Sequence, residues 1–461
     1  MKLGDICSKI GSGATPRGGK DSYKDSGTAI IRSQNVLDWS FSSSGLAFID
    51  DDQSKALSNV EVKQGDVLLN ITGDSVARAC MVPSEFLPAR VNQHVAIIRA
   101  NEEANNLFLL AWLQANKGTL LKLASSGATR NALTKRMLEN LDVNLPPIDV
   151  QDKAAAFIDS IQAKIALNTK LNGYLEELLL AKCAELENGV KEFCTVDNYC
   201  KRVYSGGTPS TKNASYWNGA LPWLSSGETR ARFIIGAEKT ITPEGVRCSS
   251  TKLARRGNVV MASAGQGFTR GQTSMLLFDA YVNQSIAVME PKEGCGSYLL
   301  FALARRYEEL RAWSDSTSTR GSMSGKVLKQ FALPRLSNAQ LGQFETFANP
   351  LVQRIEINLR ESKSLAALRD ALLPKLMSGE IDVSKVDLTQ LNSHLAKSLR
   401  QLGRHVSPHK NGAARAPANC PVSPAITLQR QPALLPISQI AHPADRGAWA
   451  FPLGRNPRLR L

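Results

Sequence analysis

Two short segments of this 461-residue sequence surround an arginine with small polar residues. Residues 125–131 read Ser-Ser-Gly-Ala-Thr-Arg-Asn, and residues 316–322 read Ser-Thr-Ser-Thr-Arg-Gly-Ser. Ser and Thr hydroxyls and backbone amides bind phosphate oxygens, and an arginine can bond to guanine O6 and N7 at the same time. The two segments therefore favour contact with DNA, and Arg130 and Arg320 are candidate contacts.

Two Gly-x-Thr-Pro segments, at residues 13–16 and 206–209, are followed by further basic residues. A single arginine can be an ordinary surface charge, and a Gly/Ser loop can be a plain turn. Recurrence at matching positions is what favours binding. The candidate DNA contacts besides the two arginines above are Thr15, Arg17, Lys20, Thr208, Lys212, Arg230, Arg232 and Arg270.

The sequence contains no catalytic motif that we can identify. Neither Gly-Lys pair, at residues 19–20 and 325–326, is followed by the Ser or Thr of a phosphate-binding loop. The five histidines form no metal-binding motif, and we expect His94 to be structural. We expect the acidic run at residues 50–52 to be a solvated loop. We therefore predict a binding protein with no catalytic residue and no metal site. The alternative of an enzyme with an unrecognised site stays open.

The cysteines and the hydropathy pattern predict a cytoplasmic protein. The eight cysteines include no Cys-x-x-Cys pair and are expected to be reduced. No segment is apolar enough to predict a signal peptide or a transmembrane helix. We therefore expect no membrane contact.

The elements that must position the candidate residues occur twice along the chain. The segment Gly65–Leu69 resembles residues 257–261, and Val91-Asn92-Gln93 recurs as Val282-Asn283-Gln284. With these two included, six such matches occur in the same order at an offset near 190 residues. This regularity indicates duplication of one unit.

Each unit is predicted to join an α+β domain to a long helix. Short apolar runs predict strands at residues 66–71, 94–99, 258–262 and 285–289. Helical patterns occupy residues 107–122 and 297–313, and the long helices residues 151–186 and 341–373. The predicted parts are a first target domain at 1–148, a first helix at 149–190, a second target domain at 191–336, a second helix with a C-terminal segment at 337–388, and a tail at 389–461.

Apolar residues follow a 4–3 spacing along both long helices. This spacing is also typical of ordinary core packing, but the duplication supplies a matching partner in the same chain. We therefore predict an intramolecular antiparallel coiled coil, in which polar seam positions fix the register. The predicted seam residues are Ile161, Ile165, Asn168, Leu175, Leu351, Ile355, Asn358 and Leu365.

The net charge of +15 is unevenly distributed. Residues 191–336 carry a net charge of +9, residues 401–461 carry +7, and residues 1–148 carry +1. The tail has nine of the 21 prolines and is predicted to be disordered; it could touch DNA or be a dispensable extension. The middle segment is the better indicator of a polyanionic partner.

Several motifs resemble those of the specificity subunit of Type I restriction–modification systems. They are the Leu-Pro turn with a following Gln that opens each long helix (145–151 and 333–340), the Ser-Gly-Gly-Thr-Pro-Ser run at 205–210 with Tyr216-Trp217, and Leu-Leu-Pro-Lys-Leu-Met-Ser-Gly-Glu-Ile at 372–381. The resemblance covers about residues 1–385. The first unit departs from it by lacking the Tyr-Trp pair.

The resemblance implies two target-recognition domains in a pseudo-twofold arrangement, each reading one half of a split site in double-stranded DNA. The helix pair would set the spacer between the halves. Two modification (methyltransferase) subunits and the restriction (translocase and endonuclease) subunits would be partners. S-adenosylmethionine, ATP and Mg²⁺ would be used by those subunits, with no cofactor bound by this non-catalytic chain. The alternative is a coiled-coil scaffold with incidental DNA contact.

Overall fold

The computed structural model describes residues 1–125, 131–264, 269–317, 323–378 and 380–381. Arg130, Arg320 and the predicted tail at 389–461 lie outside the described residues. In the part that is described, no helix combines the length and the apolar character needed to cross a membrane.

The first α+β domain contains two four-stranded sheets. One is antiparallel, in the order β1 (Cys7–Ser12), β8 (Val95–Ala100), β5 (Val67–Asn70) and β6 (Ala79–Met81). The other has the order β3 (Ala47–Ile49), β2 (Thr28–Ile31), β7 (Ala89–Val91) and β4 (Glu61–Val62). Leu68 and Ile97 pack in the core shared with the second sheet, whereas Leu69 and Ile98 pack in the core on the opposite face. Alternation with period two explains why these runs are apolar throughout.

The second α+β domain repeats this strand order and adds a fifth strand, β12 (Phe233–Ile234), parallel to its neighbour in the larger sheet. Its larger sheet has the order β10 (Cys200–Ser205), β18 (Ile286–Pro291), β15 (Val259–Ala262), β16 (Thr273–Leu276) and β12. Its smaller sheet has the order β13 (Lys239–Ile241), β11 (Trp217–Leu224), β17 (Ala280–Val282) and β14 (Lys252–Ala254). Two further strands, β9 (Phe193–Thr195) and β19 (Ala332–Pro334), pair with each other.

Matching irregularities show that the two domains are copies. The register shifts between Cys7 and Lys9 where β1 meets β8, and between Cys200 and Arg202 where β10 meets β18. The central pair of each smaller sheet is parallel, β2 with β7 and β11 with β17. The four predicted strands are confirmed as β5, β8, β15 and β18.

The prediction of the two shorter helices is wrong in one respect, because each predicted segment forms two consecutive helices. The first consists of α2 (Asn106–Ala115) and α3 (Lys117–Ser125), and the second of α8 (Gly296–Arg305) and α9 (Tyr307–Thr317). At the first break, the Asn116 side chain donates to the Trp112 carbonyl at 2.9 Å. At the second, the Arg306 guanidinium donates to the Ala302 carbonyl at 2.9 Å and also pairs with Glu187. Side-chain bonds therefore help to end both helices.

The acidic run at residues 50–52 is also not the predicted solvated loop. The Asp50 carboxylate accepts a hydrogen bond from the Gln53 backbone N–H at 2.9 Å and caps α1 (Asp51–Ala56). Asp51 and Asp52 lie in the first turn of that helix, where negative charge is favourable. The other short helices are α4 (Lys135–Glu139), α6 (Val196–Tyr199), α7 (Pro243–Arg247) and α10 (Gly325–Lys329).

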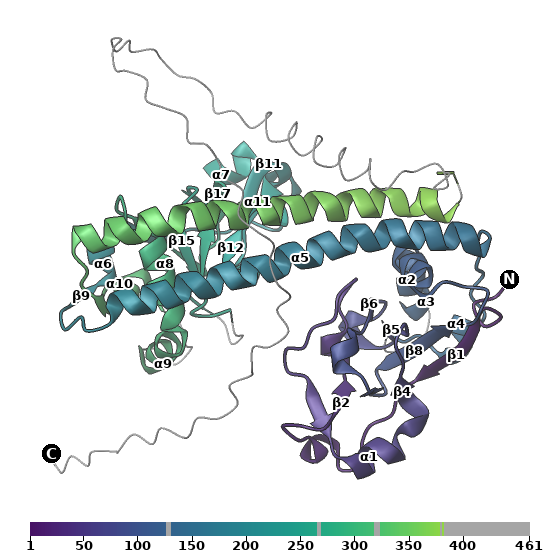
Figure 1. Cartoon of the computed structure of the whole chain (residues 1–461). Coiled ribbons are helices and arrows are strands. Elements are labelled where there is room, and N and C mark those ends of the chain that lie inside the picture. Colours follow the sequence, from purple (N-terminus) through teal and green to yellow (C-terminus); the bar gives the residue numbers. More distant parts are fainter. Residues whose placement is uncertain (126–130, 265–268, 318–322, 379, 382–461) are drawn as a thin grey trace, which may run out of the picture. The chain divides into compact units, whose positions relative to one another are not determined.

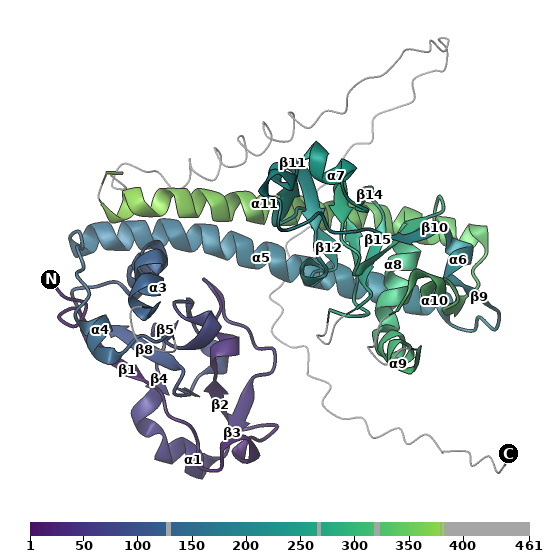
Figure 2. The same ribbon diagram turned by 180° about the vertical axis from the view of Figure 1, so that it is seen from behind.

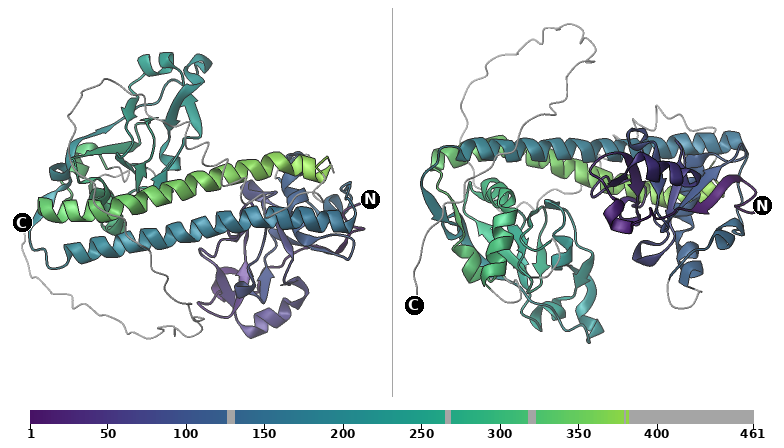
Figure 3. Two further views of the ribbon diagram at one scale, coloured as in Figure 1. Left: turned by 45° about the horizontal axis from the view of Figure 1, so that its top comes forward. Right: turned by 90° about the horizontal axis from the view of Figure 1, so that it is seen from below.

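Two helices of 40 residues each, α5 (Ile148–Glu187) and α11 (Asn338–Met377), lie side by side (Figure 1, Figure 2 and Figure 3). Pro147 precedes α5, and the Ser337 and Gln340 side chains form a capping box at the start of α11. Contacts between the two run in opposite chain directions: Gln162 meets Arg369, whereas Asn172 meets Asn358.

Both long helices contribute to the packing of each α+β domain. Phe108 of α2 shares a cluster with Ile158 of α5 and Leu373 of α11. In the second domain, Phe301 of α8 shares a cluster with Leu179 of α5 and Phe344 of α11. Each domain therefore packs against a helix of its own repeat and a helix of the other.

Candidate nucleic-acid interface

One edge of the antiparallel sheet gathers the recurring motifs in each domain. Ser12 at the end of β1 and Asn70 at the end of β5 pair with Ala96 and Val95 at the start of β8. The Gly-x-Thr-Pro segment, the residues after β5 and the Val-Asn-Gln segment therefore meet at this edge. The same holds in the second domain, where Ser205 and Ala262 pair with Ala287 and Ile286.

A threonine and a glutamine from the two motifs are bonded to each other in both domains. The Thr15 hydroxyl donates to Oε1 of Gln93, and the Thr208 hydroxyl donates to Oε1 of Gln284 at 2.5 Å. Both glutamine residues are exposed. The structure thus brings Thr15 and Thr208 to equivalent places and shows a partner for each that the sequence analysis did not select.

The asparagine of each Val-Asn-Gln segment holds the turn before the following strand. Oδ1 of Asn92 accepts from the His94 backbone N–H at 3.1 Å, and Oδ1 of Asn283 accepts from the Ser285 backbone N–H at 3.1 Å. Both asparagines are buried. The turn that carries each glutamine therefore has the same hydrogen-bonded frame in both domains.

Each Gly-x-Thr-Pro segment begins with a glycine, Gly13 or Gly206, that has no room for a side chain. A Cβ atom on Gly13 would lie 2.0 Å from the Val91 carbonyl oxygen, and one on Gly206 would lie 1.9 Å from the Val282 carbonyl oxygen. No side chain fits at those distances. Glycine is therefore required for the close backbone approach that brings threonine to glutamine.

A hollow of about 440 Å³ lined by polar residues adjoins this edge in the first domain. His94 lines it and is hydrogen-bonded at both ring nitrogens, to the Thr72 hydroxyl at 2.7 Å and to Nε2 of Gln93 at 3.0 Å. The Gly73 N–H donates to the Asn131 carbonyl at 3.3 Å, so the end of the first Ser/Thr-Arg segment lies here. The residues lining the hollow are Ser33, Gln34, Thr72, Gly73, Asp74, Ser75, Arg78 and His94.

The remaining accessible candidates lie on loops of the two domains. Arg17 is exposed, and its backbone N–H and carbonyl bond to the Gln53 side chain at 3.3 and 3.0 Å. Lys212 and Arg230 are exposed in the second domain. Of Lys20 the structure describes only the backbone.

Arg270 is buried in the second domain, and Arg232 is half-buried there. Nη1 of Arg232 donates to the Thr273 carbonyl at 2.6 Å, and burial lowers the pKa of Arg232, against the opposing effect of Glu176. Arg270 is 5% exposed and lies 2.7 Å from Asp315. Both guanidinium groups therefore have partners within the protein, and Arg270 is the one buried side chain among the described candidates.

Two tryptophans of the second domain hold its Thr-Pro segment in place. Trp223 Nε1 donates to the Gly207 carbonyl at 3.3 Å, and Trp217 Nε1 donates to the Ser210 carbonyl at 3.1 Å. The two rings pack edge to face with centroids 5.0 Å apart. The Tyr-Trp motif is thus placed to hold the loop through Trp217.

The predicted seam residues belong to α5 and α11, and all of them are buried or half-buried. Polar contacts occupy the middle: Nδ2 of Asn168 donates to Glu361 at 2.8 Å, and Nδ2 of Asn358 donates to Oδ1 of Asn172 at 2.8 Å. Satisfied polar groups at such places favour one register over others. Ile161, Asn168, Ile355, Asn358 and Leu365 are buried, and Ile165, Leu175 and Leu351 are half-buried.

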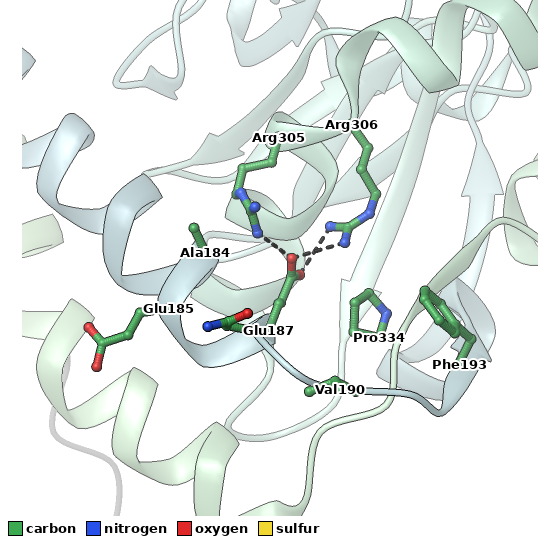
Figure 4. Close-up of a pocket in the computed structure, with 9 residues that line it drawn as sticks. Ala184, Glu185, Glu187, Val190, Phe193, Arg305, Arg306 and Pro334 are labelled. Atoms are coloured by element: carbon green, nitrogen blue, oxygen red, sulfur yellow. Dashed lines mark hydrogen bonds and ion pairs between the residues drawn. The ribbon is translucent and has the colours of Figure 1, made fainter. Parts of the chain in front are cut away.

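A buried carboxylate fastens the end of α5 to the second domain. Glu187, whose side chain is 5% exposed, accepts from Nη2 of Arg306 at 2.9 Å, from the Tyr298 hydroxyl at 3.1 Å and from Arg305. Figure 4 shows both guanidinium groups pointing at this carboxylate beside a hollow of about 500 Å³. Burial, with the Glu187 charge next in effect, raises the pKa of Tyr298. The sequence analysis missed this cluster.

The first domain is fastened differently. The guanidinium of Arg369 from α11 lies 4.4 Å from the ring centroid of Trp39 and donates to Oε1 of Gln162 from α5 at 2.6 Å. A cation over an aromatic ring is attracted by the π-electrons. No group of three metal-ligating side chains occurs among the residues that the structure describes.

The first part of the chain is similar to a known family. Residues 1–177 match the family described as Type I restriction modification DNA specificity domain. The chain is 26% identical over 169 residues to the Type I restriction enzyme MjaIX specificity subunit of Methanocaldococcus jannaschii. That match covers 35% of this chain and 38% of the relative, so it spans well under half of the relative's length.

Two solved structures are also similar. The S subunit of a Type I restriction-modification system from M. genitalium gives a TM-score of 0.49 at 12% identity, over 82% of this chain and 95% of that chain. The HsdS subunit from Thermoanaerobacter tengcongensis gives a TM-score of 0.32 at 18% identity, over 83% of this chain and 96% of that chain.

Proposed function

We propose that this chain, whose residues 1–177 belong to the Type I restriction modification DNA specificity domain family, is as a whole the DNA-specificity subunit of a Type I restriction–modification complex. Its two α+β domains would each read one half of a split site in double-stranded DNA. The chain itself would be non-catalytic and would bind no cofactor.

One observation carries this proposal: two domains of the same topology present the same bonded Thr-Gln pair at the same sheet edge. A duplicated reading surface suits a target with two halves, because half-site geometry mirrors protein symmetry. The accessible candidates Thr15, Arg17, Thr208, Lys212 and Arg230 would contact DNA from these edges, with Lys20, Arg130 and Arg320. Arg232 and Arg270 would support the second edge from inside.

The long helices would form a pseudo-twofold antiparallel coiled coil that acts as a ruler. α2 packs beside the first part of α5, and α8 beside its last part. At about 1.5 Å per residue, 40 residues span roughly 60 Å. Helix length would therefore determine how many unread base pairs separate the two half-sites.

An exposed apolar stripe on α5 supports docking of the two modification subunits. Leu167, Leu171, Tyr174 and Leu178 are 59%, 38%, 56% and 47% exposed and recur at a helical spacing. In an antiparallel pair, Ile357 of α11, 55% exposed, falls on the same side. Those subunits would supply methylation with S-adenosylmethionine, and the restriction subunits would use ATP and Mg²⁺.

Lengthening the ruler tests the proposal. Four residues inserted after Asn168, matched by four after Asn358, add about 6 Å to the helix pair. Because base pairs rise by about 3.4 Å, we expect the preferred spacer to lengthen by one to two base pairs while both half-sequences stay the same. Methylation of a library of sites with randomised spacers, by the assembled complex, measures this.

A second insert separates length from sequence. Four residues of a different helix-forming sequence, inserted at the same two places, should lengthen the spacer by the same amount. A changed half-sequence with an unchanged spacer contradicts the ruler. Footprinting distinguishes the scaffold alternative, since a scaffold with incidental DNA contact would protect no pair of half-sites.

A further inference from the structure

We propose that Gln93 and Gln284 make the same base contact in the two half-sites, each bonding the major-groove edge of one purine, with adenine the best match. This inference rests on the proposed function and names the side chains that read a base shared by both halves. Neither glutamine is among the candidates selected from the sequence.

The threonine hydroxyl determines how each amide is presented. Because Thr15 and Thr208 donate to Oε1, the amide oxygen keeps one free lone pair, and Nε2 carries two N–H donors. Among the described residues, Nε2 of Gln284 has no hydrogen-bond partner, and Nε2 of Gln93 bonds only to His94, at 3.0 Å. Each amide therefore offers an acceptor and a donor, which is the pattern that pairs with N6 and N7 of adenine.

The framework around each glutamine prepares this contact before DNA arrives. The buried asparagine next to it holds the turn, and Gly13 or Gly206 allows the threonine segment to approach closely. A side chain already held by a hydrogen bond loses less conformational freedom on binding. Exposure of both glutamines means that core packing does not account for them.

The surroundings of the two pairs differ, whereas the pairs themselves do not. His94 follows Gln93, but Ser285 follows Gln284, and Ala14 precedes Thr15, but Gly207 precedes Thr208. The tryptophan pair of the second domain is a further difference, because residues 13–35 of the first domain contain no tryptophan. The differing residues suit bases that differ between the half-sites, and the common pair suits a base that both contain.

The test uses the full chain assembled with its modification subunits. Methylation of a site library randomised in both halves is compared for the wild-type chain, Gln93→Ala and Gln284→Ala. We expect Gln93→Ala to reduce discrimination at one purine position of the first half-site by about 5- to 150-fold. Gln284→Ala should do the same in the second half-site only. Replacing that adenine by 7-deazaadenine should weaken wild-type binding and leave the matching alanine variant unaffected.

Matched controls are the exposed glutamines Gln64, which lies at the other end of β5, and Gln330, after α10. Gln64→Ala and Gln330→Ala should not change the profile. Thr15→Val removes the positioning hydroxyl and should relax the same base position as Gln93→Ala, with no additional relaxation in the double variant. That coincidence is not expected from a purely structural threonine.

Three results would overturn the inference. They are unchanged profiles in both alanine variants, uniform weakening at all positions, which would indicate phosphate contact, and relaxation at a pyrimidine. If the wild-type complex shows no preference for two half-sites, the proposed function fails instead. The two failures are thus distinguishable in one experiment.

Discussion

Replacing Glu187 with alanine is expected to lower the free energy of unfolding by about 3–5 kcal/mol, the range for breaking a buried ion pair from one side. The carboxylate is 5% exposed and accepts from two guanidinium groups and the Tyr298 hydroxyl. Its loss leaves Arg306, whose side chain is 15% exposed, without its counterion. Urea unfolding followed by circular dichroism measures the change.

Glu185 provides the matched control two residues away in the same helix. Its side chain is 69% exposed and pairs with Lys182, and Figure 4 shows it pointing away from the arginines. Glu185→Ala should change the free energy of unfolding by less than about 0.5 kcal/mol. Equal effects of the two substitutions would contradict the role assigned to the Glu187 cluster.

If the apolar stripe docks modification subunits as proposed, introducing two carboxylates into it, as Leu171→Glu with Tyr174→Glu, is expected to weaken that assembly by more than about 100-fold. Both positions are exposed in the free chain, so folding should be unaffected. In a docked complex the new charges would be buried without partners, which costs several kcal/mol. Size-exclusion chromatography of the mixed subunits and methylation by the mixture measure the effect.

The control carries the same charges on the other flank of the same helix. Ala166 and Thr169 are exposed, are three residues apart like Leu171 and Tyr174, and lie at positions that face away from the stripe. Ala166→Glu with Thr169→Glu should leave assembly intact. If the stripe variant assembles as tightly as this control, the modification subunits do not dock there.

Repeats and periodicity made much of the fold predictable. The long helices were expected at residues 151–186 and 341–373 and extend over Ile148–Glu187 and Asn338–Met377. Thr15 and Thr208 were selected because their segments recur, and the structure places them at equivalent edges of the two domains, each bonded to a glutamine. Local patterns carry this information because helices and strands each have a fixed period.

Contacts between residues distant along the chain were not predictable in the same way. Arg232 and Arg270 have the same charge as surface arginines, and only the fold shows that Thr273 and Asp315 engage them. Glu187 meets Arg306 across 119 positions of sequence. The helix breaks at Asn116 and Arg306 depend on side-chain bonds that an apolar pattern does not reveal.

The unlike attachments of the two domains have a consequence for dissolved ions. Arg256 of the second domain pairs with Glu356 of α11 through a guanidinium that is 52% exposed, in addition to the Glu187 cluster. The first domain relies on the Trp39 ring and on apolar packing around Phe108. Because salt screens exposed charges far more than it affects apolar contacts, rising ionic strength would loosen the attachment of the second domain to the long helices before that of the first.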